Sequence, residues 1–350
     1  VFMKNIVFIL LCSIMLFSYC NRKKNIEIMA NKIPESFIYH QDTIIDNYSW
    51  MRLSDKQKES SIPDEQTKNV LQYLEKENDY LNKEMIDTKL FQEKLFNEFV
   101  SRIKQDDESV PVTYNGYTYY SKFDKGADYA CHYRKKNVDG SKEELILNLP
   151  ELAKDESYFS LRGKSVSENN KYLAYSTDVV SRREYTIYVK DLETGKILED
   201  KIENTTGSIT WANDNKTIFY AKQDNITLRS NKIFKHVLGT DPSKDELVFE
   251  EKDDTFSCFV YKTKSKKYLM IGSYQTLSTE YRFLDADNPN GDWRIVQPRE
   301  RNLEYSISHF EDNFYILTNW DAKNFRLMKT SISNPSKFNW VDVIPHRDDV

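Results

Sequence analysis

Short apolar segments alternate with polar turns from about residue 105 to the end of the chain, and they recur at a long, regular spacing. Five of them resemble one another and are rich in aromatic and β-branched residues: GYTYYSK, KYLAYS, KTIFYA, KYLMIGS and NFYILTN. Their anchor residues, separated by 55, 46, 50 and 46 positions, are Tyr117, Tyr172, Ile218, Tyr268 and Phe314. Such segments are typical of β-strands, so the pattern predicts one strand repeated five times.

Two further strand-like segments follow each anchor. The second reads DYACHYRKK, EYTIYVKDL, KIFKHVLGT, EYRFLDAD or NFRLMKTS, and the third reads EELILNL, GKILEDKI, DELVFEE, DWRIVQP or FNWVDVI. A period of about 45–50 residues with several strands is the signature of β-propeller blades, whereas a helical solenoid would show helical periodicity within each repeat. We therefore expect an all-β fold and an incomplete propeller over residues 105–350, with blades at 105–155, 156–205, 206–252, 253–304 and 305–350.

Residues 21–104 have a different pattern. The first part, 21–62, is expected to be extended and irregular, and its aromatic stretch DNYSWMR could dock onto another domain. Pro63 and Asp64 then mark a helix start, and apolar residues follow at helical spacing. The first helix carries Val70, Leu71, Leu74, Leu81 and Met85, and the second carries Leu90, Leu95, Phe96, Phe99, Val100 and Ile103. These amphipathic faces are expected to be buried against a partner.

The first 20 residues look like an export signal. Lys4 precedes an apolar run from Ile6 to Tyr19, which is too short to span a bilayer comfortably and is typical of a secretory signal peptide. Met3 is the expected start, and LFSYC resembles a bacterial lipobox that would be lipidated at Cys20. Tyr19 departs from that pattern, because a small residue usually precedes the cysteine. We expect export to the periplasm or cell envelope, with a short uncleaved anchor as the alternative.

Composition and residue spacing limit which ligands and partners this protein is expected to bind. Hydrophobic residues make up 39% and charged residues 30% of the chain, and the net charge of −5 argues against nucleic acid. Cys131 and Cys258 fall in repeats that are not adjacent, so they are expected to be free buried thiols. No cysteine or histidine spacing suggests a metal site, and no cofactor is expected. The scattered histidines are expected to be ordinary polar or half-buried residues: His40, His132, His236, His309 and His346.

Several stretches together resemble oligopeptidase B of the prolyl oligopeptidase family of serine peptidases: YLEKENDYLN, RIKQDDESVPV, YSTDVVSRREYTIYVKDLETG, WANDNKTIFYAKQDNITLR, KHVLGTDPSKDELVFEEKDDTF and YILTNWDAKNFRL. The similarity runs in register from about Ile33 to the last residue. It implies a seven-bladed propeller inserted between an N-terminal segment and a C-terminal α/β-hydrolase domain. It also implies cleavage of short peptides after Lys or Arg, with the propeller excluding large substrates and residues 64–104 packing on the hydrolase domain or its hinge.

The nucleophile motif of that family, G-x-S-x-G, does not occur in the sequence. Ser165 follows Gly163 by two positions, but Ser167 stands where the second glycine belongs, so Ser165 is not expected to be a nucleophile. The catalytic Ser, Asp and His, the oxyanion hole, the acidic pocket for a basic side chain and about two blades are expected beyond Val350. We therefore interpret the chain as the N-terminal portion of a larger peptidase, inactive and poorly soluble on its own.

Two alternatives remain open at this point. The chain could be a lipid-anchored propeller that binds a ligand without chemistry, or a hydrolase whose site lies inside the propeller. The second would need convergent carboxylates or metal ligands on the inner strands. The acidic pairs, however, are expected to lie in solvated loops: Asp106–Asp107, Glu250–Glu251 and Asp253–Asp254. An in-frame continuation with G-x-S-x-G, then Asp and His, would favour the peptidase.

A charged elbow joins two strands of the second repeat. It consists of Arg182, Arg183 and Glu184. The elbow is interpreted either as the rim of the blade or as an accessory site. The resemblance places an accessory role at the peptidase domain, through interdomain ion pairs or a contact with substrate.

Overall fold

The computed structural model describes residues 28–347 and 349, in two compact units that divide between Lys104 and Gln105. The first unit starts with an antiparallel hairpin of β1 (Glu35–Tyr39) and β2 (Asp42–Asp46). The expectation of an irregular segment is therefore wrong here. The hairpin turn consists of His40 and Gln41, both at positive φ (48° and 74°), and lacks the Asn-Gly or Asp-Gly signal by which such turns are recognised.

The two expected helices are confirmed. After the short α2 (Asp55–Lys58), α3 (Glu65–Glu84) begins at Asp64, whose carboxylate accepts a 2.8 Å hydrogen bond from the Thr67 N–H. A 3₁₀ turn (Ile86–Thr88) leads into α4 (Lys89–Arg102). The aromatic stretch docks within its own unit, since the 3₁₀ turn Ser49–Met51 holds Trp50 edge-on against Tyr73 of α3, 6.5 Å between ring centres.

The apolar faces of these helices stay largely exposed within their unit. On α3 the buried residues are Thr67 and Val70. On α4, Leu90, Phe96 and Phe99 are 82%, 66% and 61% exposed. The expectation that these faces are buried against a partner therefore stays a prediction.

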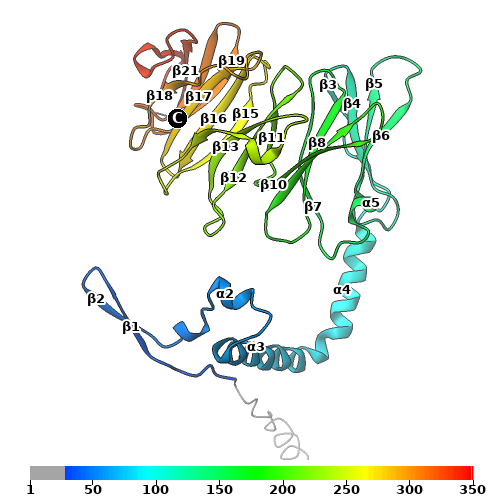
Figure 1. Cartoon of the computed structure of the whole chain (residues 1–350), viewed down its shortest axis with the longest axis vertical. Coiled ribbons are helices and arrows are strands. Elements are labelled where there is room, and N and C mark those ends of the chain that lie inside the picture. Colours follow the sequence, from blue (N-terminus) through cyan, green and yellow to red (C-terminus); the bar gives the residue numbers. More distant parts are fainter. Residues whose placement is uncertain (1–27, 348, 350) are drawn as a thin grey trace, which may run out of the picture. The chain divides into compact units, whose positions relative to one another are not determined.

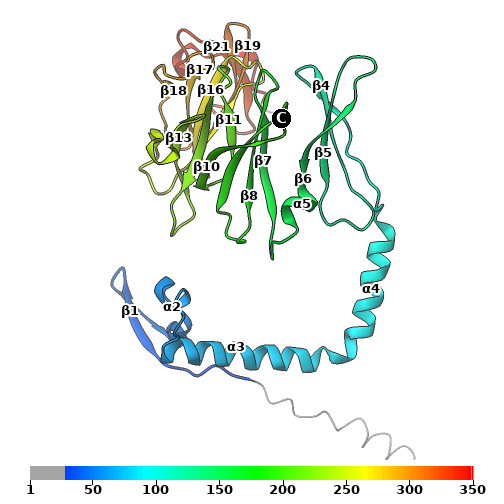
Figure 2. The ribbon, with the colours of Figure 1, turned by 45° about the vertical axis from the view of Figure 1, so that its right-hand side comes forward.

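The second unit contains five four-stranded antiparallel sheets, each a simple meander (Figures 1 and 2). Sheet one is β3 (Val112–Tyr114), β4 (Tyr117–Lys122), β5 (Cys131–Lys136) and β6 (Glu143–Asn148); sheet two is β7 (Ser160–Val166), β8 (Tyr172–Asp178), β9 (Tyr185–Asp191) and β10 (Ile197–Thr205). Sheet three is β11 (Ile209–Trp211), β12 (Thr217–Gln223), β13 (Ser230–Val237) and β14 (Glu246–Glu250). Sheet four is β15 (Ser257–Lys262), β16 (Tyr268–Gln275), β17 (Ser278–Asp285) and β18 (Arg294–Gln297); sheet five is β19 (Tyr305–Phe310), β20 (Asn313–Thr318), β21 (Arg326–Ser331) and β22 (Val341–Ile344). The short α5 (Leu149–Ala153) joins sheets one and two.

These sheets confirm the propeller fold class and its five expected repeats. All strand pairs recorded in the described part of the chain are antiparallel. The structure adds a fourth strand to each repeat, which precedes the anchor strand: β3, β7, β11, β15 and β19. The polar turns between the first two strands are tight and include residues at positive φ such as Asn170 and Asn215. The first strands were missed because some are only three residues long and they carry polar residues.

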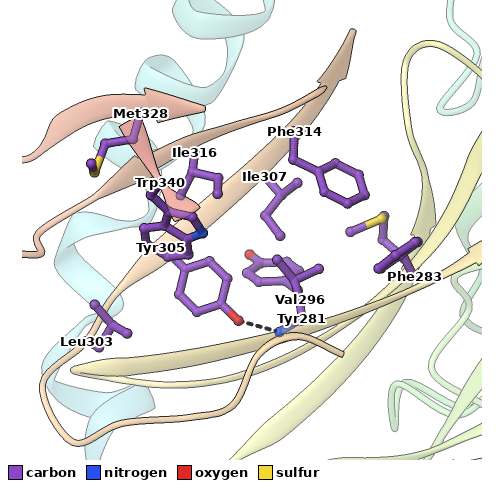
Figure 3. Packing of buried hydrophobic residues seen from close by; sticks show 11 residues of the cluster. Tyr281, Phe283, Val296, Leu303, Tyr305, Ile307, Phe314, Ile316, Met328 and Trp340 are labelled. Carbon is purple, nitrogen blue, oxygen red and sulfur yellow. Dashed lines mark hydrogen bonds between the residues drawn. The ribbon is translucent and has the colours of Figure 1, made fainter. Parts of the chain in front are cut away.

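Apolar residues between successive sheets hold the unit together. Between sheets four and five, Tyr281 and Phe283 pack with Tyr305 and Phe314 in a cluster that Figure 3 shows from close by. The Tyr305 hydroxyl accepts a 3.0 Å hydrogen bond from the Tyr281 N–H and donates to the Gln297 carbonyl at 2.6 Å, so this buried polar group is satisfied. Cys131 and Cys258 are free and buried, as expected.

Glu251 corrects one expectation about the acidic pairs. It is 4% exposed rather than part of a solvated loop, and its carboxylate binds the Arg299 guanidinium through both oxygens at 2.6 and 3.3 Å. Arg299 also approaches Glu280, at 3.4 Å, and lies over the Phe256 ring. A carboxylate inside a protein needs a partner of this kind, and the arginine comes from a segment 48 residues away.

Candidate functional site

A cavity of about 870 Å³ lies among the first four sheets of the second unit. Its walls come from the first strands β3, β7, β11 and β15 and from the neighbouring β4 and β5. The first strands meet here: the Trp211 indole N–H of β11 donates to the Ser165 carbonyl of β7 at 3.0 Å, and the Thr210 hydroxyl donates to the Val260 carbonyl of β15 at 3.1 Å. The size is within the range of pockets that bind small ligands.

Lysines dominate the charge of the cavity wall. The four lysines that line it are Lys164, Lys262, Lys264 and Lys266. The lining residues also include one carboxylate, that of Glu168. Glu168, in the turn after β7, contacts the Lys262 ammonium through Oε1 and the Lys266 ammonium at 2.8 Å through Oε2. Burial raises the pKa of Glu168, but the two lysines outweigh it and hold that pKa below its usual value. Glu168 is therefore ionised at neutral pH and neutralises one of the four positive charges.

Lys164 has a different environment. Its Nζ lies 2.8 Å from Nδ1 of His132, which extends from β5. Burial, together with the Lys164 charge, lowers the pKa of His132 to about 4, and burial also lowers the pKa of Lys164. His132 is therefore neutral at neutral pH and can accept a hydrogen bond from the ammonium, but it cannot compensate its charge.

Aromatic rings form much of the remaining wall. Tyr120 and Tyr133 stack with 5.9 Å between ring centres, and Trp211 and Tyr261 line the opposite strands. Ser165 also lines the cavity, but it lies inside strand β7 and not at a strand-to-helix turn. The arrangement therefore suits binding of a ligand with apolar and anionic groups.

The charged elbow does not belong to the cavity. Arg182, Arg183 and Glu184 are exposed between β8 and β9, and among the described residues no ion pair is recorded for their side chains. Their backbone is nevertheless fixed, because the buried Asp178 carboxylate accepts hydrogen bonds from the N–H groups of Val180, Ser181 and Arg183 at 2.8, 3.0 and 2.7 Å. The elbow is thus a rigid loop that presents three charged side chains to solvent.

Replacing Asp178 with alanine is expected to free the elbow and to destabilise the second unit by about 2 kcal/mol, because three backbone donors lose their acceptor. The check is limited digestion with trypsin, which should cut faster after Arg182 or Arg183, together with urea unfolding. Asp224→Ala is the matched control, since Asp224 accepts from Ile226 and Thr227 in the equivalent connection of sheet three. Equal cleavage of the elbow in both variants would contradict the anchoring role of Asp178.

The local sequence does not single out the cavity lysines, which lie in and beside one of the polar turns that separate the apolar segments. The signal that could have pointed to them is the alternation of Lys262, Lys264 and Lys266, which places lysines at every second position from the end of one strand into its turn. Lys164 and His132 are 32 residues apart, and no local pattern joins them. Of the acidic pairs, none lines the cavity within the part of the chain that the structure describes.

Comparison with known proteins shows which family has this architecture. Residues 29–350 match the family model of the prolyl oligopeptidase N-terminal β-propeller domain. The chain is 36% identical to dipeptidyl aminopeptidase BI of Pseudoxanthomonas mexicana, covering 87% of this chain and 43% of that protein. It is 33% identical to protease 2 of Moraxella lacunata, covering 90% and 45%.

Solved structures agree with the sequence relatives. Oligopeptidase B from Leishmania major superposes with a TM-score of 0.82 at 27% identity, over 91% of this chain and 46% of that chain. Oligopeptidase B from Trypanosoma brucei with covalently bound antipain, in a closed form, gives a TM-score of 0.79 at 26% identity, over 92% and 46%. The chain thus spans less than half the length of these relatives. With its five meander sheets and this match over nearly all described residues, the chain belongs to the prolyl oligopeptidase N-terminal β-propeller family.

Proposed function

We propose that this chain is the propeller portion of a serine peptidase that acts on short peptides. In this proposal the propeller caps a C-terminal α/β-hydrolase domain, which supplies the Ser, Asp and His, and it keeps large folded proteins away from them. The observation that carries the proposal is the family match over residues 29–350, combined with coverage of less than half of each relative. The exposed apolar residues of α4 support it, because they require a partner surface.

Two specificities compete for this peptidase. Endopeptidase cleavage after Lys or Arg is supported by the resemblance to oligopeptidase B. Release of dipeptides from a free N-terminus is supported by the 36% identity to a protein named dipeptidyl aminopeptidase BI. A lipid-anchored binding module without chemistry remains the alternative to both.

Sequencing the DNA downstream of the Val350 codon, followed by an assay of the complete protein, tests the proposal. We expect an in-frame G-x-S-x-G, then Asp and His, and hydrolysis of Arg-amide substrates that replacement of the new serine abolishes. Hydrolysis of substrates with a blocked N-terminus would favour the endopeptidase, and a requirement for a free amine would favour dipeptide release. A stop codon and no hydrolysis would overturn the peptidase and leave the binding module.

The elbow is proposed as an accessory to that reaction. Ser160, the first residue of β7, pairs with Asp178, so the elbow lies at the edge where the chain enters sheet two. The chain enters sheet one at the corresponding edge, where the Ser109 N–H donates to the Ser121 carbonyl. An interdomain or substrate contact at this edge predicts that Arg183→Ala or Glu184→Ala in the complete enzyme raises KM several-fold and leaves the nucleophile intact. Unchanged kinetics in both variants would reduce the elbow to scaffold.

Export to the cell envelope, with lipidation of Cys20, is also proposed. It is supported by the order of Lys4, an apolar run and a lipobox-like stretch. Residues 1–27 lie outside the described residues, and within the part that the structure describes no helix is long and apolar enough to cross a membrane. Membrane fractionation tests the anchor: Cys20→Ala should release the protein, and unchanged association with membranes would exclude lipidation as its cause.

A further inference from the structure

The cavity among the first four sheets carries more positive charge than its own carboxylate can compensate. Both Glu168 oxygens are occupied, one by Lys262 and one by Lys266. Within the described part of the chain, no ion pair is recorded for the two remaining lysines of the wall, Lys164 and Lys264. A concave wall of one charge sign concentrates ligands of the opposite sign.

We propose that this cavity binds a carboxylate of a short peptide, with Lys164 and Lys264 as the groups that recognise it. The inference rests on the proposed peptidase function, which it deepens by naming a recognition element in the propeller. Lys164 is the central residue, because its recorded polar partner is a histidine ring and not an anion.

The neighbours of Lys164 favour this role. The pKa of His132 is about 4, so the ring stays neutral and leaves the ammonium without a counter-charge near neutral pH. The 2.8 Å contact with Nδ1 uses one of the three ammonium donors and fixes the direction of the side chain. The other two donors remain for a ligand, and a hydrogen bond from an ammonium to a carboxylate is stronger than one between neutral groups.

The rest of the wall selects a peptide rather than a small inorganic anion. Tyr120, Tyr133 and Tyr261 supply flat apolar surface, and a volume of about 870 Å³ is far larger than one anion needs. Peptide side chains and backbone would contact the rings while a carboxylate reaches the lysines. That carboxylate can be the C-terminal group of the peptide or an Asp or Glu side chain, since the chemistry is the same.

Calorimetric titration of the complete protein with three peptides lacking Lys and Arg tests the inference without relying on cleavage. The first has neutral side chains and a free C-terminal carboxylate, the second is its C-terminal amide, and the third is the amide with one internal Glu. We expect the acid to bind roughly tenfold more tightly than the amide, and this preference to weaken at high salt. Tighter binding of the Glu peptide than of the plain amide would show that a side-chain carboxylate is also accepted.

Three variants connect that preference to Lys164. Lys164→Met should bring the affinities for acid and amide close together, chiefly by weakening the binding of the acid, and Lys164→Arg should retain the preference because the positive charge is kept. Lys216→Met is the matched control, since Lys216 is an exposed lysine of the same unit outside the cavity wall. Far-ultraviolet circular dichroism confirms that each variant is folded.

Equal binding of acid and amide by the unaltered protein would overturn the inference, as would an unchanged preference in folded Lys164→Met. These results are independent of the hydrolysis assay. A complete protein that prefers the acid but hydrolyses no peptide would retain the carboxylate site and lose the peptidase function. A peptidase without the preference would retain the function and lose the site.

Discussion

Replacing Gly163 with valine is expected to destabilise the second unit by about 3 kcal/mol, at the upper end of the cost of overpacking a well-packed site. A Cβ at this position would lie 2.2 Å from the Gly207 carbonyl oxygen and 3.0 Å from the Ser176 hydroxyl. The first of these atoms belongs to the backbone that joins sheets two and three, so the chain itself would have to move. Urea unfolding of the complete protein, followed by tryptophan fluorescence, measures the loss.

The hydrogen bonds at this junction explain why the space is closed. The Gly163 N–H donates to the Ser176 hydroxyl at 2.8 Å, and that hydroxyl donates to the Gly207 carbonyl at 2.8 Å. A side chain at Gly163 would separate these groups and leave buried polar atoms without partners. Gly195→Asn is the control, because Gly195 has φ +74° and no atom within 4 Å of an added Cβ, and asparagine tolerates that conformation. A loss below 1 kcal/mol for Gly163→Val would contradict the close approach.

The second large effect is expected at His236. Replacing it with leucine should destabilise the second unit by about 3–5 kcal/mol, because it leaves two buried carboxylates without their shared partner. His236 is 0% exposed, with Nδ1 2.7 Å from Asp245 and Nε2 2.9 Å from Asp200. The Tyr220 hydroxyl donates to the second oxygen of Asp245 at 2.8 Å, so the network joins sheets two and three. The expectation that all histidines are ordinary polar or half-buried residues is wrong for this one.

The same network makes stability depend on pH. Burial alone lowers the pKa of His236, but the hydrogen bonds and charges of Asp245 and Asp200 raise it above 6.5. Since the folded-state pKa lies above the unfolded value, the stabilisation is complete below pH 6.5 and is lost as pH rises through the folded-state pKa. We expect the stabilisation by His236, measured between pH 6 and pH 9 as the difference in free energy of unfolding between the unaltered protein and His236→Leu, to fall as the pH rises.

Urea unfolding across that range tests both statements. His40→Asn is the control variant, because His40 is an exposed turn residue at positive φ, where asparagine is tolerated. It should keep the stability and the pH dependence of the unaltered protein. A loss below 1 kcal/mol for His236→Leu at pH 6 would show that the two carboxylates find other partners.

The local sequence predicts the strands of the sheets well, because their burial follows a period of two. In β9, Tyr185, Ile187 and Val189 are buried and alternate with half-buried residues. The anchor strands are recognisable because they are longer and more apolar, and β8 is buried over six of its seven residues. Among the first strands, β3 and β11 are too short to show a period. The longer β19 does show one, since its buried and exposed residues alternate strictly.

The burial and the ion-pair partners of the charged residues follow no local period of this kind. Glu251 occurs in an acidic pair that local sequence assigns to solvent, yet Arg299, from the connection that follows the next sheet, makes its burial possible. The cavity wall is a similar case, since Lys262 and Lys266 meet Glu168 across almost a hundred residues. No local pattern records which sheet will face which, so partners of this kind could not be predicted.

The sequence by itself determined the repeat, the antiparallel sheets, the two helices and the family resemblance, because hydrophobic periodicity and turn residues act over a few positions. Tertiary structure alone decided the buried His236 network, the close approach at Gly163 and the cavity with its uncompensated lysines. Each of these depends on the packing of one sheet against another. Packing brings together groups that are distant in the chain, and their burial then decides whether a charge is neutralised, shifted in pKa or left to bind a ligand.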